Sequence, residues 1–325
     1  MPNFNGVWSL TTQLQYASAW PVPPSSGWLM AGEISGNSKS DTVTVVTLTS
    51  GGAVSDFGDM AVGQNRPAAC SSTTRGIIGG GADENSGSAG SDTIQYITLS
   101  STGSGSDFGN LTVARRHLSG HSNSTRGLFS GGEAASDGTA KNVIDYITIA
   151  STGNATDFGD MTRASEYGTA TGSTTRGLHA GGRLGSTYYN VIDYVTIGST
   201  GNSTDFGDLS SNKYVFDSLS SNTRAVFLGG NDTSSNTNEI EYVTIASTGN
   251  VTDFGDLTSA SRFFSDSSFS SGAFGFIFPS SPQAHEKITI ASTGNSADAF
   301  SDLSNSDFVQ VGEFGSVSDA HGGIG

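Results

Sequence analysis

The sequence predicts an all-β protein built from six repeats, each containing four short strands. The tripeptide Asp-Phe-Gly recurs about every 50 residues, and the segments between its copies are rich in Val, Ile, Tyr, Phe and Thr. Clusters such as Ser-Thr-Gly-Asn separate these segments as turns, and no stretch has the periodicity of an amphipathic helix. Similarity at a nearly fixed period is typical of a repeat architecture.

Three motifs occur once in each repeat. The Asp-Phe-Gly copies begin at Asp56, Asp107, Asp157, Asp205 and Asp253, and a degenerate copy begins at Asp298. The second motif is usually Arg-Gly followed by apolar residues and Gly-Gly; it begins at Arg75, Arg126, Arg176 and Arg224, with weaker copies at Ser26 and Phe274. The third is an apolar run centred on Val45, Tyr96, Tyr146, Tyr194, Tyr242 and Lys287.

The repeats differ in length mainly in one segment. The separation between the centre of the apolar run and the Asp of Asp-Phe-Gly is the same in all six repeats, as from Tyr146 to Asp157. In contrast, the segment just after Gly-Gly differs in length from one repeat to the next. In a four-stranded repeat this segment is the loop between the second and third strands.

Repeat 3 contains the expected strands at 115–120, 126–132, 143–150 and 155–161. Its third strand is apolar on both faces, because Ile144 and Tyr146 alternate with Val143 and Ile147. Such a strand belongs to a sheet that is covered on both sides. Sheets packed face to face around an axis provide this cover, so the repeats predict a β-propeller.

The repeats also resemble a known family. Four strands, Gly-Gly after the second, Tyr in the third and an aromatic residue in the fourth together resemble the kelch repeat, over roughly residues 25–305. The resemblance implies a kelch-like β-propeller. Kelch repeats usually have Trp in the fourth strand, where this chain has Phe57, Phe108, Phe158, Phe206 and Phe254. We expect these five residues to be structural core, and the four recurring arginines to pair with acids between blades.

We divide the chain into an N-terminal arm (residues 1–24), a propeller (25–313) and a C-terminal tail (314–325). Six repeats predict six four-stranded blades, and the spacing places a closing strand at 308–312, beside the strand at 27–32. Closure removes the open edges that invite aggregation. A seven-bladed ring is the alternative, with a composite blade built from both termini, because Trp8 falls at the aromatic position of a fourth strand.

The variable loops are predicted to share one face of the ring. In a propeller, the loops joining strands 2–3 and 4–1 of each blade lie on the same face, which we call the loop face. A rigid scaffold with varied loops is typical of a binding surface, and Tyr and Arg are common in interface hot spots. The candidate binding residues are Arg183, Tyr188, Tyr189, Asp83, Glu84, Asp137 and Asp232.

Composition argues against several other functions. Lys plus Arg number 14 and Asp plus Glu number 30, and the resulting charge of −16 is unsuited to nucleic acid or an anionic membrane surface. No apolar run is long enough to insert into a membrane. The recurring residues are symmetric, whereas catalysis needs an asymmetric group of side chains, so we expect no catalytic residue and no cofactor. We expect no histidine metal site, because His117 and His121 are about 13 Å apart in an extended strand. Loop carboxylates such as Asp83 with Glu84 could hold calcium, but no loop has the ligand spacing of a dedicated calcium site.

The amino-acid sequence of the repeats, as in DYITIASTGNATDFGDMT (145–162), also resembles kelch-type proteins of marine tailed phages, especially cyanophages. The opening GVWSLTTQLQYASAWP resembles a short segment of phage tail and other virion proteins. This arm carries the large apolar residues Trp8, Leu10, Leu14, Tyr16 and Trp20, more than a free tail should expose. We therefore expect the arm to anchor the propeller to other virion proteins.

These resemblances imply a non-enzymatic virion protein, either a tail-associated adhesin or a tail or capsid decoration, present in multiple copies. It would contact a host surface protein or glycan. The start MPNFNGVWSLTTQ lacks the regions of a signal peptide, so we expect synthesis in the host cytoplasm and a final location in the virion. Two alternatives remain: a cellular kelch-type adaptor for protein–protein contact, and a propeller-borne carbohydrate-active enzyme.

Overall fold

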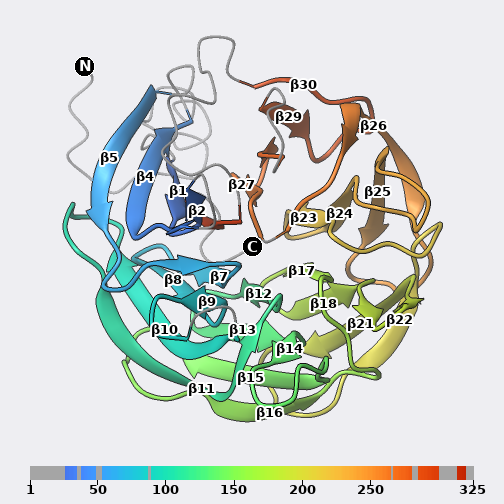
Figure 1. Cartoon of the computed structure of the whole chain (residues 1–325). Helices are drawn as coiled ribbons and strands as arrows, with labels where there is room; N and C mark the ends of the chain where they lie inside the picture. The colour runs from blue at the N-terminus through green and yellow to red at the C-terminus, as the bar shows by residue number, and fades with distance from the viewer. Residues whose placement is uncertain are drawn as a thin grey trace, which may run out of the picture.

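The structure is a computed structural model, and it describes residues 26–34, 38–48, 53–86, 89–264, 266–279, 285–299 and 313–319. These residues form strands and turns and contain no helix. Six antiparallel sheets surround a central axis, as Figure 1 shows. The prediction of an all-β propeller with six blades is confirmed, and the seven-bladed alternative is wrong.

Each blade has four strands, which follow one another from the axis outwards. Blade 1 contains β31 (Gly315–Ser318), β1 (Ser26–Met30), β4 (Thr42–Thr47) and β5 (Ala53–Asp59). Blade 2 contains β7 (Ala68–Ser71), β8 (Arg75–Gly79), β10 (Ser91–Thr98) and β11 (Ser106–Arg116). Blade 3 contains β12 (Ser119–Ser122), β13 (Arg126–Ser130), β15 (Val143–Thr148) and β16 (Thr156–Asp160).

The second half of the ring repeats this order. Blade 4 contains β17 (Thr169–Gly172), β18 (Arg176–Ala180), β21 (Val191–Thr196) and β22 (Thr204–Asp208). Blade 5 contains β23 (Asp217–Ser220), β24 (Arg224–Leu228), β25 (Thr237–Thr244) and β26 (Thr252–Ser261). Blade 6 contains β27 (Phe269–Ser270), β28 (Phe274–Ile277), β29 (Glu286–Thr289) and β30 (Ala297–Asp298).

Short strands extend the blades at one end. β14 (Glu133–Ala134) pairs with the end of β11. The remaining two-stranded pairs are β2 (Glu33–Ile34) with β3 (Ser38–Lys39), β6 (Gln64–Asn65) with β9 (Ala82–Asp83), and β19 (Arg183–Leu184) with β20 (Thr187–Tyr188).

The ring closes between the two ends of the propeller. β31 pairs antiparallel with β1, with Trp28 opposite Val317 and Met30 opposite Gly315. β31 also contacts β7 and β27, the innermost strands of the neighbouring blades. As predicted, a C-terminal strand completes blade 1 by pairing with the strand near 27–32. This closing strand lies at 315–318, however, and not at 308–312.

The longer connection before β31 explains this error. In blades 2 to 5 the innermost strand begins at a constant separation from the Asp of Asp-Phe-Gly, as Thr169 follows Asp157. The separation between Asp298 and Gly315 is larger, which shifts the closing strand into the segment predicted to be a tail. Residues 308–312 and the arm (1–24) lie outside the described residues.

The recurring aromatic residues form the core of the blades. The phenylalanines of Asp-Phe-Gly are all buried. In blade 3, the rings of Phe158 and Tyr146 meet edge to face with their centroids 5.9 Å apart, and blades 2, 4 and 5 repeat this pair. Blade 1 has Trp28 against Phe57 at the same distance. Each pair adds aromatic contact energy to the burial of apolar area.

The recurring arginines join neighbouring blades through carbonyl oxygens. Nη1 of Arg126 donates to the backbone oxygen of Ile197 in blade 4 at 2.9 Å, and its guanidinium lies 4.9 Å from the Tyr146 ring centre. The same two contacts are made by Arg75, Arg176 and Arg224. The expected pairing of these arginines with acids is therefore wrong, because stacking on the tyrosine directs each guanidinium to a turn carbonyl of the next blade.

Other basic residues make the buried ion pairs between blades. Arg115, at the end of β11 in blade 2, binds Asp145 in β15 of blade 3 at 2.6 Å, and both side chains are fully buried. The equivalent pairs are Arg163 with Asp193, and Lys213 with Glu241. Each basic residue lies in the chain that leads into the next blade, so these pairs hold successive blades together.

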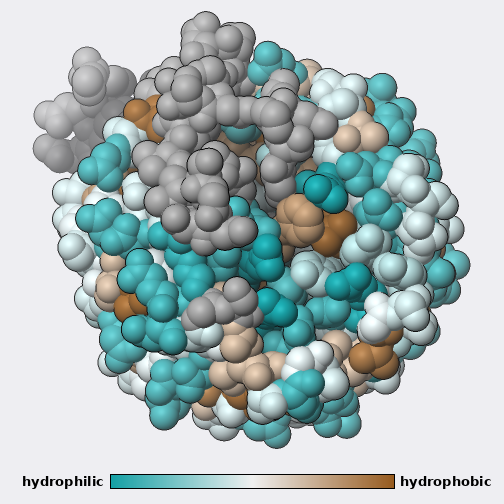
Figure 2. All heavy atoms as spheres, in the orientation of Figure 1, coloured by the Kyte–Doolittle hydropathy of each residue, from teal (hydrophilic) through white to brown (hydrophobic). Residues whose placement is uncertain are grey.

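The surface in Figure 2 is mostly hydrophilic, and the hydrophobic residues among the coloured atoms are scattered. Leu184 and Phe274 are the large hydrophobic residues exposed within the described ranges. Nowhere in the described part of the chain is there a helix with the length and apolar character needed to cross a membrane.

Candidate functional site

The connections between blades meet the variable loops on the loop face. Arg116 pairs with Glu133 where the end of β11, leading from blade 2 into blade 3, meets β14. The equivalent bridges are Asn65 with Ala82, Glu166 with Arg183, and Tyr214 with Asn231. The separation of the two partners along the sequence is identical in all four cases. The same backbone geometry therefore presents different side chains in different blades.

The next residue along each connection belongs to a ring around the axis, which we call the axis ring. Its members in blades 1 to 5 are Glu313, Arg66, His117, Tyr167 and Val215. Their φ angles lie between 48° and 58°, a left-handed conformation that is uncommon for residues other than glycine. Backbone hydrogen bonds join neighbours: Arg66 N donates to Glu313 O at 2.8 Å, and Tyr167 N donates to His117 O at 3.1 Å.

The conformation of the axis ring points to a role for its side chains. A left-handed backbone costs roughly 1–2 kcal/mol for a residue with a Cβ, and glycine would avoid this cost. The chain nevertheless has a charged residue, His or Tyr at four of these five left-handed positions. Residues held in such strained conformations cluster at functional sites. We therefore take the axis ring and its neighbours as the candidate site.

Arg66 connects three members of the ring. Its Nε is 2.8 Å from Glu313 Oε2, and its Nη1 is 3.2 Å from His117 Nε2. Burial alone would lower the pKa of Arg66, but the hydrogen bond and charge of Glu313 outweigh burial and raise it. Since the Arg66 guanidinium can only donate, Nε2 of His117 is the acceptor in this hydrogen bond. The His117 ring stacks on Tyr167, with 3.8 Å between ring centres.

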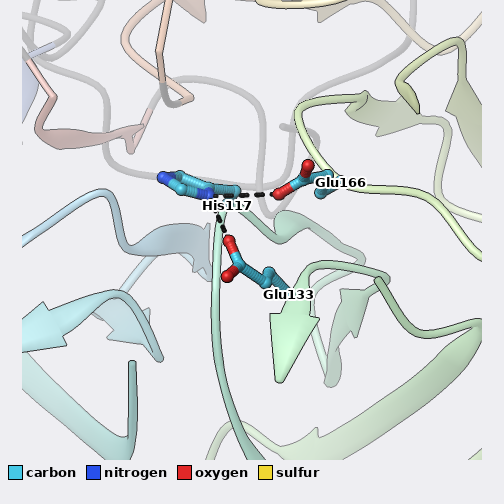
Figure 3. A group of neighbouring side chains, drawn as sticks. All are labelled: His117, Glu133 and Glu166. Carbon is cyan, nitrogen blue, oxygen red and sulfur yellow. Dashed lines mark ion pairs between the residues drawn. The ribbon is translucent and has the colours of Figure 1, made fainter. Parts of the chain in front are cut away.

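Two glutamates converge on Nδ1 of His117, as Figure 3 shows. Oε2 of Glu133 lies 3.6 Å from Nδ1, and Oε2 of Glu166 lies 3.5 Å from it. Arg116 binds both oxygens of Glu133 at 3.1 and 3.2 Å, and Arg183 Nε binds Oε1 of Glu166 at 3.1 Å. The neighbouring His117 and Arg116 lower the pKa of Glu133 to about 2, so this carboxylate is ionised at neutral pH.

An aromatic cluster lies beside this group. The Arg183 guanidinium is 4.8 Å from the ring centre of Tyr167 and 5.4 Å from that of Tyr214. The ring of Tyr188, which pairs with Arg183 across β19 and β20, lies 4.9 Å from that of Tyr214. All four side chains are partly exposed. Two of the predicted binding residues, Arg183 and Tyr188, are thus brought together next to the axis ring.

The structure separates Tyr189 from this cluster. Its ring lies 5.1 Å from the guanidinium of Arg163, the residue that forms the ion pair between blades 3 and 4. Burial lowers the pKa of Arg163, although the charge of Asp193 opposes this shift. Tyr189 therefore packs against scaffold residues rather than beside Tyr188.

The predicted acids stabilise their own loops. Asp83 is buried and accepts hydrogen bonds from the Ser91 hydroxyl at 2.5 Å and from the Asn85 and Ser86 amides. Burial alone would raise the pKa of Asp83, but these hydrogen bonds outweigh burial and lower it. Its neighbour Glu84 is exposed. Asp83 is therefore a turn-forming residue and not an open ligand.

The other two acids are arranged in the same way. Asp137 is exposed and binds Lys141 at 2.6 Å, and this bond together with those from Thr139 lowers the pKa of Asp137 to about 2. Asp232 accepts bonds from the amides of Ser234 and Ser235, which lower its pKa. The described contacts of both acids stay within their own loops, away from the axis ring.

The site residues that the sequence analysis did not select lie at a fixed position in each repeat. Arg66, His117, Tyr167 and Val215 all follow the Asp of Asp-Phe-Gly at one constant separation. Side-chain chemistry that changes at a constant position in the repeat marks a place where the scaffold presents varied groups. Glu133 and Glu166 could be located in the same way, because the two partners of each bridge have a constant separation along the sequence. Together with His117 they form the one group of three potential metal ligands found among the described residues.

No protein-family model matches the chain, and no curated protein matches it. The kelch and phage resemblances therefore remain interpretations of the repeats. The site itself combines charged and aromatic side chains on a rigid ring, an arrangement suited to binding a polar ligand or partner.

Proposed function

We propose that this chain is a non-enzymatic binding protein of a phage virion, either a tail-associated adhesin or a tail or capsid decoration. In this proposal the loop face recognises a host surface protein or glycan. The N-terminal arm, residues 1–24, attaches the propeller to other virion proteins in multiple copies. The six-bladed scaffold supports a role in binding and interaction in general. The resemblance of the repeat sequences to kelch-type phage proteins supports the virion location.

The observation that carries the binding role is the axis ring. Identical backbone positions in successive blades hold Glu313, Arg66, His117, Tyr167 and Val215, with different chemistry at each. Arg183 and Tyr188 extend this varied surface outwards, and both residue types are common in interface hot spots. The motifs that recur without variation, in contrast, make core and inter-blade contacts. Different side chains at identical backbone positions of a rigid scaffold favour a role in recognition.

The location is tested by imaging. Purified phage particles are labelled with antibody to this chain and examined by negative-stain electron microscopy. Label at the tail or the capsid is expected, and it would also tell an adhesin from a capsid decoration. Particles without label, with the protein recovered from infected-cell lysate in a complex with a host protein, would instead support the cellular adaptor.

The arm is tested by deletion of residues 1–22. The shortened chain is expected to keep its melting temperature but no longer join particles. Misfolding of the shortened chain would overturn the anchoring role, because the arm would then be part of the ring.

Recognition is tested with a double variant of the aromatic cluster, Arg183→Ala with Tyr188→Ala. Binding of the purified chain to host cells is expected to fall, with the melting temperature nearly unchanged. The matched control is Thr200→Ala, an exposed residue in the 3–4 turn of blade 4 on the opposite face. Equal binding by both variants would contradict the use of the loop face.

A further inference from the structure

Three potential ligand atoms from two blades meet beside the axis. They are Nδ1 of His117, Oε2 of Glu133 and Oε2 of Glu166, and all three lie within 4.8 Å of one another (Figure 3). The His117 side chain is 1% exposed and that of Glu166 is 10% exposed. We propose that these three residues bind a first-row divalent metal ion of the Zn²⁺ class at the mouth of the propeller axis.

The distances are longer than those of ordinary N–H···O hydrogen bonds and are suitable for coordination. An N–H···O hydrogen bond spans about 2.7–3.2 Å, whereas Nδ1 lies 3.5 and 3.6 Å from the two carboxylate oxygens. Both Nδ1 of His117 and Oε2 of Glu166 are buried without a hydrogen-bond partner. Ligands about 2.1 Å from a tetrahedral Zn²⁺ are separated by about 3.4 Å. The observed separations are therefore close to an edge of a coordination tetrahedron.

The surrounding arginines orient the two carboxylates. Arg183 binds Oε1 of Glu166 and leaves Oε2 directed at His117. Arg116 binds Glu133 through both oxygens, which fixes the plane of that carboxylate. Partners of this kind commonly hold metal ligands in position.

The charge of the group is compatible with a dication. Glu133, Glu166 and Glu313 contribute three negative charges, which balance the three positive charges of Arg66, Arg116 and Arg183. The ion pairs of the group are thus balanced, in a chain whose net charge is −16. One imidazole nitrogen with two carboxylates favours a first-row metal over Ca²⁺, which prefers oxygen ligands alone.

Arg66 and the metal require different tautomers of His117. A metal on Nδ1 requires the proton on Nε2, and Nη1 of Arg66 lies 3.2 Å from Nε2. Two donors would then face each other, so the guanidinium has to turn away when the metal binds. The Arg66 side chain is 26% exposed, which leaves room for this movement. Replacing Arg66 with glutamine supplies an oxygen that can accept from Nε2–H, so Arg66→Gln is expected to bind the metal more tightly.

The experiment uses the full chain after treatment with a chelator and dialysis. Titration calorimetry with ZnCl₂ is expected to show one equivalent of bound metal. Addition of CoCl₂ is expected to give the visible absorption of Co²⁺ with low coordination number and a nitrogen ligand. Glu166→Gln and Glu133→Gln are expected to weaken Zn²⁺ binding at least about tenfold, because a loss of this size already follows when only the partners of metal ligands are mutated.

The matched control is Glu239→Gln. Glu239 also pairs with a basic residue, Lys213, at 2.9 Å, but it lies in β25 and is half exposed. The melting temperature of each metal-free variant shows whether it is folded. The proposal is overturned if the wild type shows no saturable Zn²⁺ binding, or if folded Glu166→Gln and Glu133→Gln bind as tightly as the Glu239→Gln control. Because binding is measured on the isolated chain, neither outcome depends on the virion location.

Discussion

Phe158 illustrates what one side chain contributes to a blade. It is 2% exposed and packs with Leu128, Ile144 and Met161 in the core between blades 3 and 4. Phe158→Ala removes most of this buried ring and leaves a cavity, so it is expected to lower the free energy of unfolding by about 3–5 kcal/mol. Urea denaturation of the purified protein measures this change.

Tyr188→Ala is the comparison for this prediction, because Tyr188 is partly exposed on the loop face. It is expected to change stability little. Equal unfolding midpoints for wild type and Phe158→Ala would contradict the assignment of Phe158 to the core of the ring.

His121 shows how a buried side chain makes stability depend on pH. In β12 its ring occupies the space left by Gly177 of blade 4, where an added Cβ would clash with the imidazole. Neither ring nitrogen has a hydrogen-bond partner, and burial lowers the pKa of His121 to about 4. Leu219 takes the same position in blade 5 and fills the space beside Gly275. Leucine is therefore a suitable replacement for His121.

We predict that His121→Leu stabilises the protein increasingly as the pH falls. The unfolded chain takes up a proton on His121 near pH 6.5, whereas the folded protein resists it down to about pH 4. The contribution of His121 to stability is present above about pH 6.5 and is lost as the pH falls through this window. The advantage of leucine is expected to grow to about 3 kcal/mol, as measured by urea denaturation across the window.

The difference between the two proteins removes the contributions of buried groups that do not interact with His121. Burial raises the pKa of Asp217 to about 6, which makes its contribution change with pH in the opposite direction. Asp217 is present in both proteins, so its effect cancels in the comparison. A stability difference that does not vary with pH would contradict a neutral, buried His121.

Between elements, the buried ion pair of Arg115 with Asp145 is the strongest test of how blades are joined. Arg115 also donates to the carbonyls of Gly131 and Val143, so its charge is fully enclosed. Asp145→Leu leaves that charge without its counterion and is expected to cost about 3–5 kcal/mol. The double variant Arg115→Met with Asp145→Leu is expected to be more stable than the single variant, as measured by thermal and urea unfolding.

An exposed pair provides the reference for this prediction. Asp137 and Lys141 form an ion pair of the same length in a solvent-exposed loop. Asp137→Leu should have little effect, because exposed pairs contribute little to stability. If Asp145→Leu were as mild as Asp137→Leu, solvent would have to reach Arg115 and the buried pair would not join the blades.

The strands could be predicted from the sequence because their pattern is local. A third strand such as 143–150 is apolar on both faces, and only a sheet covered on both sides buries it. The partners of the recurring arginines could not be predicted in the same way. Whether Arg126 meets an acid or a carbonyl depends on how blade 4 is placed against blade 3, which no spacing within a repeat specifies. The acids that are paired, such as Asp145, find their bases in the connections.

The candidate site was only partly predictable for a related reason. Arg183 and Tyr188 stood out because they lie in a loop of variable length. His117 and Glu166 lie in connections of nearly constant length. No glycine in the sequence indicates the left-handed backbone of His117 or the β-bridge of Glu166. The conformation arises from hydrogen bonds between blades, such as Tyr167 N to His117 O. Contacts of this kind exist only after the ring has closed.

At the scale of the whole molecule, closure depends on one short strand. The innermost strands contact each other around the axis, and β31 occupies the place between β7 and β27. It also covers the inner edge of β1 and places Val317 in the core of blade 1, beside Trp28 and Ile78. Without β31, the edge of β1 is left with unpaired backbone groups and the neighbouring core is opened to water.

We therefore predict that deletion of residues 313–325 destabilises the whole ring and not blade 1 alone. Each blade packs on two neighbours, so a gap at β31 removes one support from blades 2 and 6 as well. The truncated chain is expected to melt at a lower temperature with a broader transition, and to form oligomers through the open edge of β1, as measured by calorimetry and size-exclusion chromatography. A control that lacks only residues 320–325 retains β31 and is expected to stay monodisperse. If the two truncated chains behave alike, β31 does not close the ring.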